Sequence, residues 1–98
     1  MKTKVQEILR IARMNTNYDF AATEISGCID GKTFNGLMLS RKGEEHYKAG
    51  TEYIGSVRLW DDGSFEFTGD RRATQVLAEE NEEIIHAFMK AHEFLNSL

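Results

Sequence analysis

Apolar and polar positions follow a helical period at the start of the chain. Over residues 3–14 the apolar side chains recur at intervals of three and four, and the charged side chains fall mostly on the other side. The pattern predicts an amphipathic helix over residues 3–14. Asn15, Thr16 and Asn17 are expected to end it, because asparagine tolerates the left-handed conformation in which many helices terminate.

The pattern then changes to that of β-strands. Residues 18–29 and 32–40 read as two strands joined by Asp30-Gly31, a dipeptide that favours a tight hairpin turn. Asn35-Gly36 lies inside the second strand and predicts a β-bulge or a shifted register there. The following residues, 41–50, are polar and read as a loop.

A second hairpin is the clearest local signal. Residues 53–60 alternate, Asp61-Asp62-Gly63 turns the chain, and residues 65–68 return. A three-residue loop with Gly63 left-handed puts Arg58 opposite Glu66, a favourable pair. A two-residue loop leaves Arg58 opposite an apolar side chain, so we favour the three-residue loop. Its register collects four apolar side chains on one face: Val57, Leu59, Phe65 and Phe67.

The C-terminal residues 71–97 read as one long helix, with Asp70 as a candidate N-cap. Its apolar stripe centres on Phe88, which we expect to be a core residue, and Ile85 and Met89 widen the stripe. Asn81 fills one position of that stripe. The glutamates around Asn81 allow an alternative, a break or second helix start at this point.

These elements predict an α+β fold: one helix, two antiparallel hairpins that form a four-stranded sheet, and a long C-terminal helix. The 98 residues match one domain, residues 1–98. Hydrophobic residues make up 41% and charged residues 29%, which is typical of a globular chain rather than a disordered one.

Cysteine content and charge narrow the classes of partner. Cys28 is the single cysteine, so a disulfide scaffold is excluded, and its neighbours predict a buried, inert thiol. The first 14 residues lack the apolar run of a signal peptide, and no segment reaches membrane-spanning length. We therefore expect a cytoplasmic protein with no membrane partner. The net charge of −4 makes nucleic acid an unlikely partner, since nucleic-acid binding needs a basic surface.

Catalytic and metal-binding patterns are not found in the sequence. No nucleophile, acid/base pair or phosphate loop is placed by its spacing. His86 and His92 are six residues apart, whereas a helical metal pair is four apart. We expect no catalytic residues, no metal and no cofactor, and hence no enzyme.

Two groups of residues are candidates for binding. Trp60 is predicted on the polar face of the second hairpin, where a tryptophan is a typical interface anchor, although a covering helix or loop would make it a core residue. Arg58, Asp61, Asp62 and Glu66 surround it. The second group is an acidic patch on the C-terminal helix, whose alternative is a solvated helix face. Its members are Glu79, Glu80, Glu82 and Glu83.

We therefore expect a non-catalytic interaction module that binds another protein and forms a homo-oligomer. In size and layout it is similar to single-domain accessory proteins of bacteriophages and mobile elements, which inhibit or divert host proteins; this is an analogy of class only. The alternative is a small-ligand-binding domain with a pocket between sheet and helices. The polar contacts of that pocket would come from Arg41, His46, Tyr47, Tyr53 and Arg58.

Overall fold

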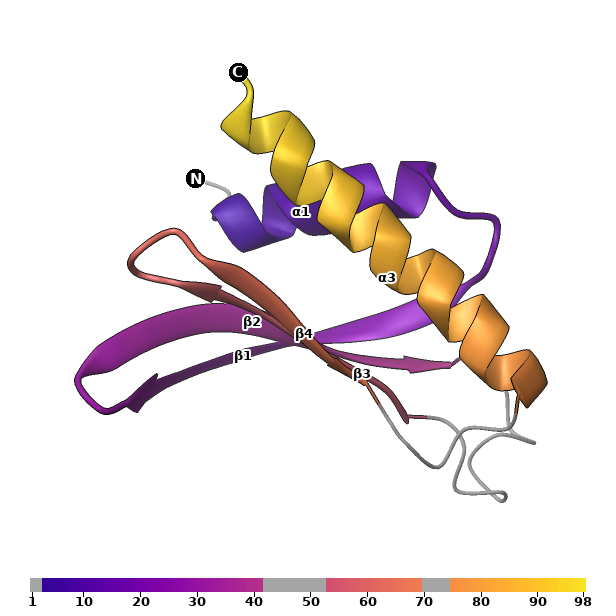
Figure 1. Ribbon diagram of the computed structural model, residues 1–98, viewed down its shortest axis with the longest axis horizontal. Coiled ribbons are helices and arrows are strands. Elements are labelled where there is room, and N and C mark those ends of the chain that lie inside the picture. Colours follow the sequence, from indigo (N-terminus) through magenta and orange to yellow (C-terminus); the bar gives the residue numbers. More distant parts are fainter. Residues whose placement is uncertain (1–2, 42–52, 70–74) are drawn as a thin grey trace. The chain divides into compact units, whose positions relative to one another are not determined.

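The computed structural model describes residues 3–41, 53–69 and 75–98, and it confirms the α+β class. A helix is followed by a four-stranded antiparallel sheet and a second helix (Figure 1). The predicted loop, apart from Arg41, and the predicted N-cap Asp70 lie outside the described residues. The elements are α1 (Lys4–Met14), β1 (Phe20–Ile29), β2 (Lys32–Arg41), β3 (Tyr53–Trp60), β4 (Phe65–Gly69) and α3 (Gln75–Asn96).

The chain groups into two compact units. One contains both helices and spans Met1–Asp19 and Thr74–Leu98, while the other contains the sheet and spans Phe20–Ala73. The prediction of one domain over residues 1–98 stays a prediction.

The start and the end of α1 are both set by side chains. Thr3 Oγ1 accepts the backbone N–H of Gln6 at 3.2 Å, and Gln6 Oε1 accepts the backbone N–H of Thr3 at 3.1 Å, which completes a capping box. At the other end Asn15 has φ −111°, so the expected left-handed ending is wrong. Instead, Asn15 Nδ2 donates to the Ile11 carbonyl at 2.8 Å and satisfies a carbonyl that the helix leaves open.

The two helices pack against each other at an oblique angle (Figure 1), and the start of α1 lies beside the end of α3. Lys4 Nζ, at the start of α1, donates to Asn96 Oδ1, at the end of α3, at 2.9 Å. Apolar side chains of both helices are buried, and Phe88 is completely inaccessible, which confirms its predicted place in the core. The others in this group are Val5, Ile8, Ala12, Ile84, Ala87 and Ala91.

Helix α3 is continuous through its acidic segment, so the alternative break near Asn81 is wrong. Asn81 itself is buried, as its position in the apolar stripe predicts. The glutamates on either side of it stay partly or fully exposed, and so they do not force the helix to start again.

The sheet has the order β1-β2-β3-β4, and both predicted hairpin turns are present. Asp30 and Gly31 have positive φ angles of 53° and 80°, which is the backbone of a tight two-residue turn. Gly63 has φ 90°, and Arg58 lies opposite Glu66 in the register. The three-residue loop and its register are therefore confirmed.

The irregularity of the sheet lies elsewhere than predicted. Asn35 and Gly36 pair regularly with both neighbouring strands, so the expected bulge there is wrong. The register shifts instead between Leu39 and Ser40. Gly36 has a different role: a Cβ atom at this position would run into the carbonyl oxygen of Val57, and glycine permits that close backbone approach.

Candidate functional site

Trp60 forms an aromatic pair with Phe34 on one face of the sheet. The two residues are directly opposite each other in the β2–β3 register. Their ring centroids are 5.1 Å apart with an interplanar angle of 60°, the edge-to-face arrangement that aromatic rings prefer. Both side chains are half-buried, so Trp60 is neither a fully buried core residue nor a freely exposed one.

Gly27 explains why the Phe34 ring lies so close to the sheet. Gly27 is the β1 partner of Phe34, and a Cβ atom on it would be 2.8 Å from Phe34 Cε1. The missing side chain leaves the space that the ring occupies. Phe34 is therefore packed against β1 on one side and against Trp60 on the other.

Arg58 completes this cluster. Its guanidinium carbon lies 5.0 Å from the centroid of the Phe34 ring, a cation–π distance. Its Nη1 atom is 3.7 Å from Glu66 Oε1 across the β3–β4 pair. Its Nε atom is buried and has no hydrogen-bond partner in the described part of the chain. These contacts hold the guanidinium over the ring rather than extended into solvent.

We call this surface the Trp60 face, and it comprises Ile29, Phe34, Met38, Arg58, Trp60 and Glu66, which alternate onto one side of the sheet. Ile29, which lies beside Trp60, is 46% exposed, and Met38, farther along β2 on the same face, is 43% exposed. The opposite face carries buried Leu37, Leu39 and Val57. A shallow hollow of about 360 Å³ lies beside Trp60. Its lining is Ile29, Asp30, Lys32, Trp60, Asp62, Ser64 and Glu66.

Asp61 and Asp62 were predicted to be charged binding residues, and their side chains make hydrogen bonds within the protein close to the two hairpin turns. We call this region the hairpin ends, and it comprises Lys32, Thr33, Asp61, Asp62 and Ser64. Asp61 Oδ2 accepts the backbone N–H of Thr33 at 3.1 Å and its hydroxyl at 3.2 Å. Asp62 Oδ1 accepts the Ser64 hydroxyl at 2.6 Å and its N–H at 2.9 Å. The Ser64 hydroxyl, more than any other contact, holds the pKa of Asp62 below its ordinary value. Asp62 thus helps to shape the β3–β4 turn, whereas Asp61 connects the end of β3 to the start of β2.

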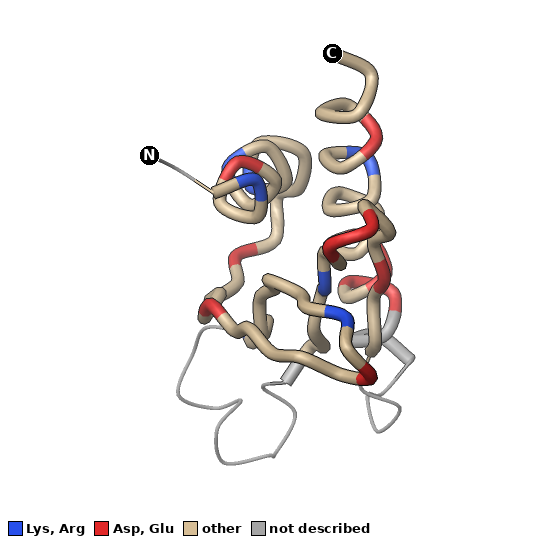
Figure 2. The backbone as a smooth tube through the Cα atoms, turned by 90° about the vertical axis from the view of Figure 1, so that its left-hand side faces the viewer, with Lys and Arg blue, Asp and Glu red and all other residues tan. Residues whose placement is uncertain are grey.

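The acidic patch belongs to the other unit of the molecule. Glu79, Glu82 and Glu83 are exposed and Glu80 is half-buried. These positions lie in the N-terminal half of α3, whereas α1 has more basic than acidic positions (Figure 2). The structure therefore assigns the two predicted groups of binding residues to different units.

Two of the five residues of the alternative ligand pocket, Arg41 and Arg58, lie on opposite faces of the sheet. Arg41 is buried on the face of the sheet that carries Leu37 and Leu39, whereas Arg58 lies on the Trp60 face. His46 and Tyr47 lie outside the described residues, as does the side chain of Tyr53. A single pocket that uses both arginines is therefore not present in the sheet.

The structure corrects the prediction for the thiol of Cys28. Cys28 is exposed, so the prediction of a buried thiol is wrong; its strand β1 lies at the edge of the sheet. Among the described residues there is no group of three His, Cys, Asp or Glu side chains placed to hold a metal ion. In the same residues no helix has the length and apolar character needed to cross a membrane.

Phe34 is the member of the site that sequence reasoning missed as a binding residue. The alternation within β2 identified it only as an apolar strand position. Its contact with Trp60 depends on the register between the two hairpins, and no turn signal sets that register. The pairing of Phe34 with Gly27 was available in the sequence, because the Asp30-Gly31 turn places them opposite each other.

Comparisons with known proteins yield no relative: no protein-family model, curated protein or solved structure matches this chain.

Proposed function

We propose that this chain is a non-catalytic interaction module that binds another protein through the Trp60 face. The observation that supports this most directly is the half-buried Phe34–Trp60 pair, beside which exposed Ile29 lines the same hollow as Trp60. Tryptophan and arginine are enriched where a few residues dominate binding energy, and such centres have apolar anchors with a polar rim. Arg58 and Glu66 form that rim.

Preorganisation strengthens the proposal. Phe34 is packed against Gly27, and Arg58 is held between the Phe34 ring and Glu66. Side chains that are already ordered lose less conformational freedom on binding, so more of the contact energy is retained as affinity. The module suits a stoichiometric accessory role in the cytoplasm, in which it inhibits or diverts its partner.

Self-association is part of the same proposal. Met89 is 37% exposed and its neighbour Ile85 is half-buried, so the side of α3 that widens the apolar stripe retains accessible apolar surface. A homo-oligomer would cover that surface. The acidic patch of α3 is proposed as a second, weaker contact for a basic partner.

The test begins with affinity capture of the partner by the full chain. Trp60→Ala should then weaken binding of the captured protein by about 2 kcal/mol, or roughly 30-fold, measured by interferometry. Tyr18→Ala is the matched control, since Tyr18 is an exposed aromatic residue outside the Trp60 face. Unchanged affinity of a folded Trp60→Ala variant would refute the proposal.

A second measurement tests whether the charge of Asp62, close to Trp60, contributes to the rate of association. Asp62→Asn removes a charge but keeps an oxygen that accepts from Ser64, so the turn should survive. If Asp62 steers encounter, this variant slows association and leaves dissociation unchanged, more so at low salt. Reversal of Asp61 is less informative, because it also removes the two contacts to Thr33.

A further inference from the structure

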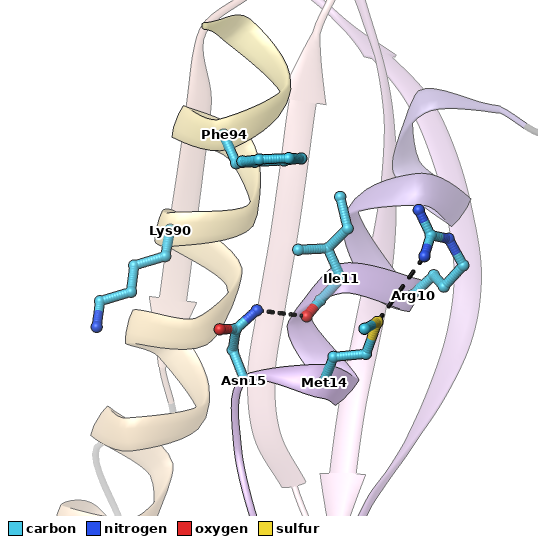
Figure 3. Close-up of a pocket in the computed structure, with 6 residues that line it drawn as sticks. All are labelled: Arg10, Ile11, Met14, Asn15, Lys90 and Phe94. Carbon is cyan, nitrogen blue, oxygen red and sulfur yellow. Dashed lines mark hydrogen bonds between the residues drawn. The ribbon is translucent and has the colours of Figure 1, made fainter. Parts of the chain in front are cut away.

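The helical unit carries a groove that the sequence did not indicate. It lies between the C-terminal half of α1 and the C-terminal half of α3 and has a volume of about 520 Å³ (Figure 3). We call it the helical groove. Its lining is Arg10, Ile11, Met14, Asn15, Lys90 and Phe94.

The centre of the helical groove is apolar and accessible. Met14 is 75% exposed and Phe94 is 54% exposed, while Ile11 is half-buried. The Phe94 ring extends from α3 toward Ile11 on α1 (Figure 3). Large apolar side chains that gather at one place on the surface, bordered by polar ones, mark interaction sites.

Each edge of the helical groove carries one basic side chain, and that of Arg10 is ion-paired with Glu7. Lys90 lies on the α3 edge and makes no ion pair or hydrogen bond through its ammonium group with any described residue. Arg10 lies on the α1 edge, where its Nη2 atom is 3.0 Å from Glu7 Oε2 and its Nη1 atom is 3.8 Å from Met14 Sδ. A guanidinium has five N–H donors, so Arg10 retains donors for a further acceptor.

We propose that the helical groove binds an amphipathic helix of another protein, one that carries carboxylates on both sides of an apolar stripe. The apolar centre matches the stripe, and the basic side chains of the two edges match acidic flanks on either side. Recognition of an amphipathic helix in an apolar groove is a common mode of peptide binding. The inference does not depend on the Trp60 face, which lies in the other unit.

Two other occupants fit the charges less well. A single-headed anionic amphiphile engages one cation and leaves the other edge unmatched. A second copy of this chain offers acidic positions on α3, but the centre of the apolar stripe of that helix, Ile84 and Phe88, is buried, and only its border with Ile85 and Met89 is accessible. A partner helix with a free apolar stripe satisfies the centre and both edges together.

Three synthetic helical peptides of about four turns test the proposal. They share one leucine stripe and differ only in the flanking residues, which are glutamate, glutamine or lysine. Fluorescence anisotropy with the full chain should show the glutamate peptide binding about fivefold or more tighter than the glutamine peptide, with the lysine peptide weakest. Salt at about 0.5 M should reduce these differences, because it screens exposed charges.

Variants of the protein test the placement of the site. Lys90→Glu should weaken binding of the glutamate peptide and strengthen binding of the lysine peptide, an exchange of preference that loss of structure cannot produce. Lys4→Glu is the control for net charge, because it makes the same change of charge at an exposed α1 position outside the groove lining. It also removes the hydrogen bond from Lys4 Nζ to Asn96 Oδ1, so an Asn96→Ala variant measures the effect of losing that bond alone. Phe94→Ala should weaken the glutamate and glutamine peptides alike.

Four results would overturn the proposal. Equal binding of all three peptides would exclude recognition by charge, and an equal effect of Lys4→Glu would reduce it to net charge. Binding of 8-anilinonaphthalene-1-sulfonate, reduced by Phe94→Ala, without peptide binding would assign the groove to small amphiphiles. A dimer in light scattering that Phe94→Asp converts to a monomer would assign it to a second copy of the chain.

Discussion

The hairpin ends and the helical groove use their charges in opposite ways. At the hairpin ends, Asp61 binds Thr33, and Asp62 binds Ser64 and lies 3.6 Å from Lys32 Nζ. In the helical groove, Lys90 has no such partner among the residues described, and it lies beside the exposed Phe94. The first region is rich in charges that are already engaged, whereas the second has few charges but leaves one available.

The difference indicates which charged residues near a candidate site are free to attract a partner. A carboxylate in a turn commonly accepts backbone N–H groups, and then it supports the local conformation rather than attracting a partner. An ammonium group that lies beside accessible apolar surface has no internal role to fulfil. The availability of a charge is therefore more informative than the number of charges nearby.

The largest expected effect compares two phenylalanines of α3. Phe88→Ala should lower the free energy of unfolding by about 3–5 kcal/mol, because Phe88 is completely buried. Phe94→Ala should change it by less than about 0.5 kcal/mol, since Phe94 is 54% exposed. Denaturant titration followed by circular dichroism measures both. A large loss for Phe94→Ala would show that Phe94 supports the fold and is not a free groove residue.

The second largest effect on stability is expected at the turn between β3 and β4, where Gly63 has a positive φ angle. Gly63 has φ 90°, and no atom lies within 4 Å of the position that a Cβ would take. Gly63→Val should therefore cost about 1–2 kcal/mol through conformational strain alone. Melting temperatures measure this effect, with Asp62→Asn as a milder control in the same turn. Parent-like stability of Gly63→Val would mean that the turn readily adopts another conformation.

The smallest effect concerns the titration of Asp62. Its pKa is lowered chiefly by the Ser64 hydroxyl, so Ser64→Ala should raise that pKa toward the ordinary carboxyl value. Because the folded pKa is the lower one, Asp62 contributes stability above the unfolded pKa of about 3.9, and that contribution is lost as the pH falls through the folded value.

Carboxyl NMR measures the pKa of Asp62 directly in the parent and in Ser64→Ala. An Asp62 titration that Ser64→Ala leaves unchanged would contradict the claim that this charge is engaged within the turn.

Local periodicity was sufficient to predict most of the elements. The helical spacing around Ile8 and Phe88 and the turn dipeptide Asp30-Gly31 each act over a few residues, so the sequence carries them directly. The register of the second hairpin followed from the chemistry of Arg58 opposite Glu66. The Asn35-Gly36 prediction failed because glycine has two uses in a strand, a bulge or a close backbone approach, and only the neighbouring strand decides between them.

Contacts between distant segments were decided by the tertiary structure alone. Alternation along a single strand is local, and it places Trp60 and Arg58 on the same face without any tertiary information. Local patterns do not show that Phe34 contacts Trp60, or that Lys90 and Phe94 line one groove with Arg10 and Ile11, because these arrangements bring together segments far apart in the chain. Such contacts depend on the pairing of hairpins and the crossing of helices, which are set by the packing of many side chains together rather than by any short pattern.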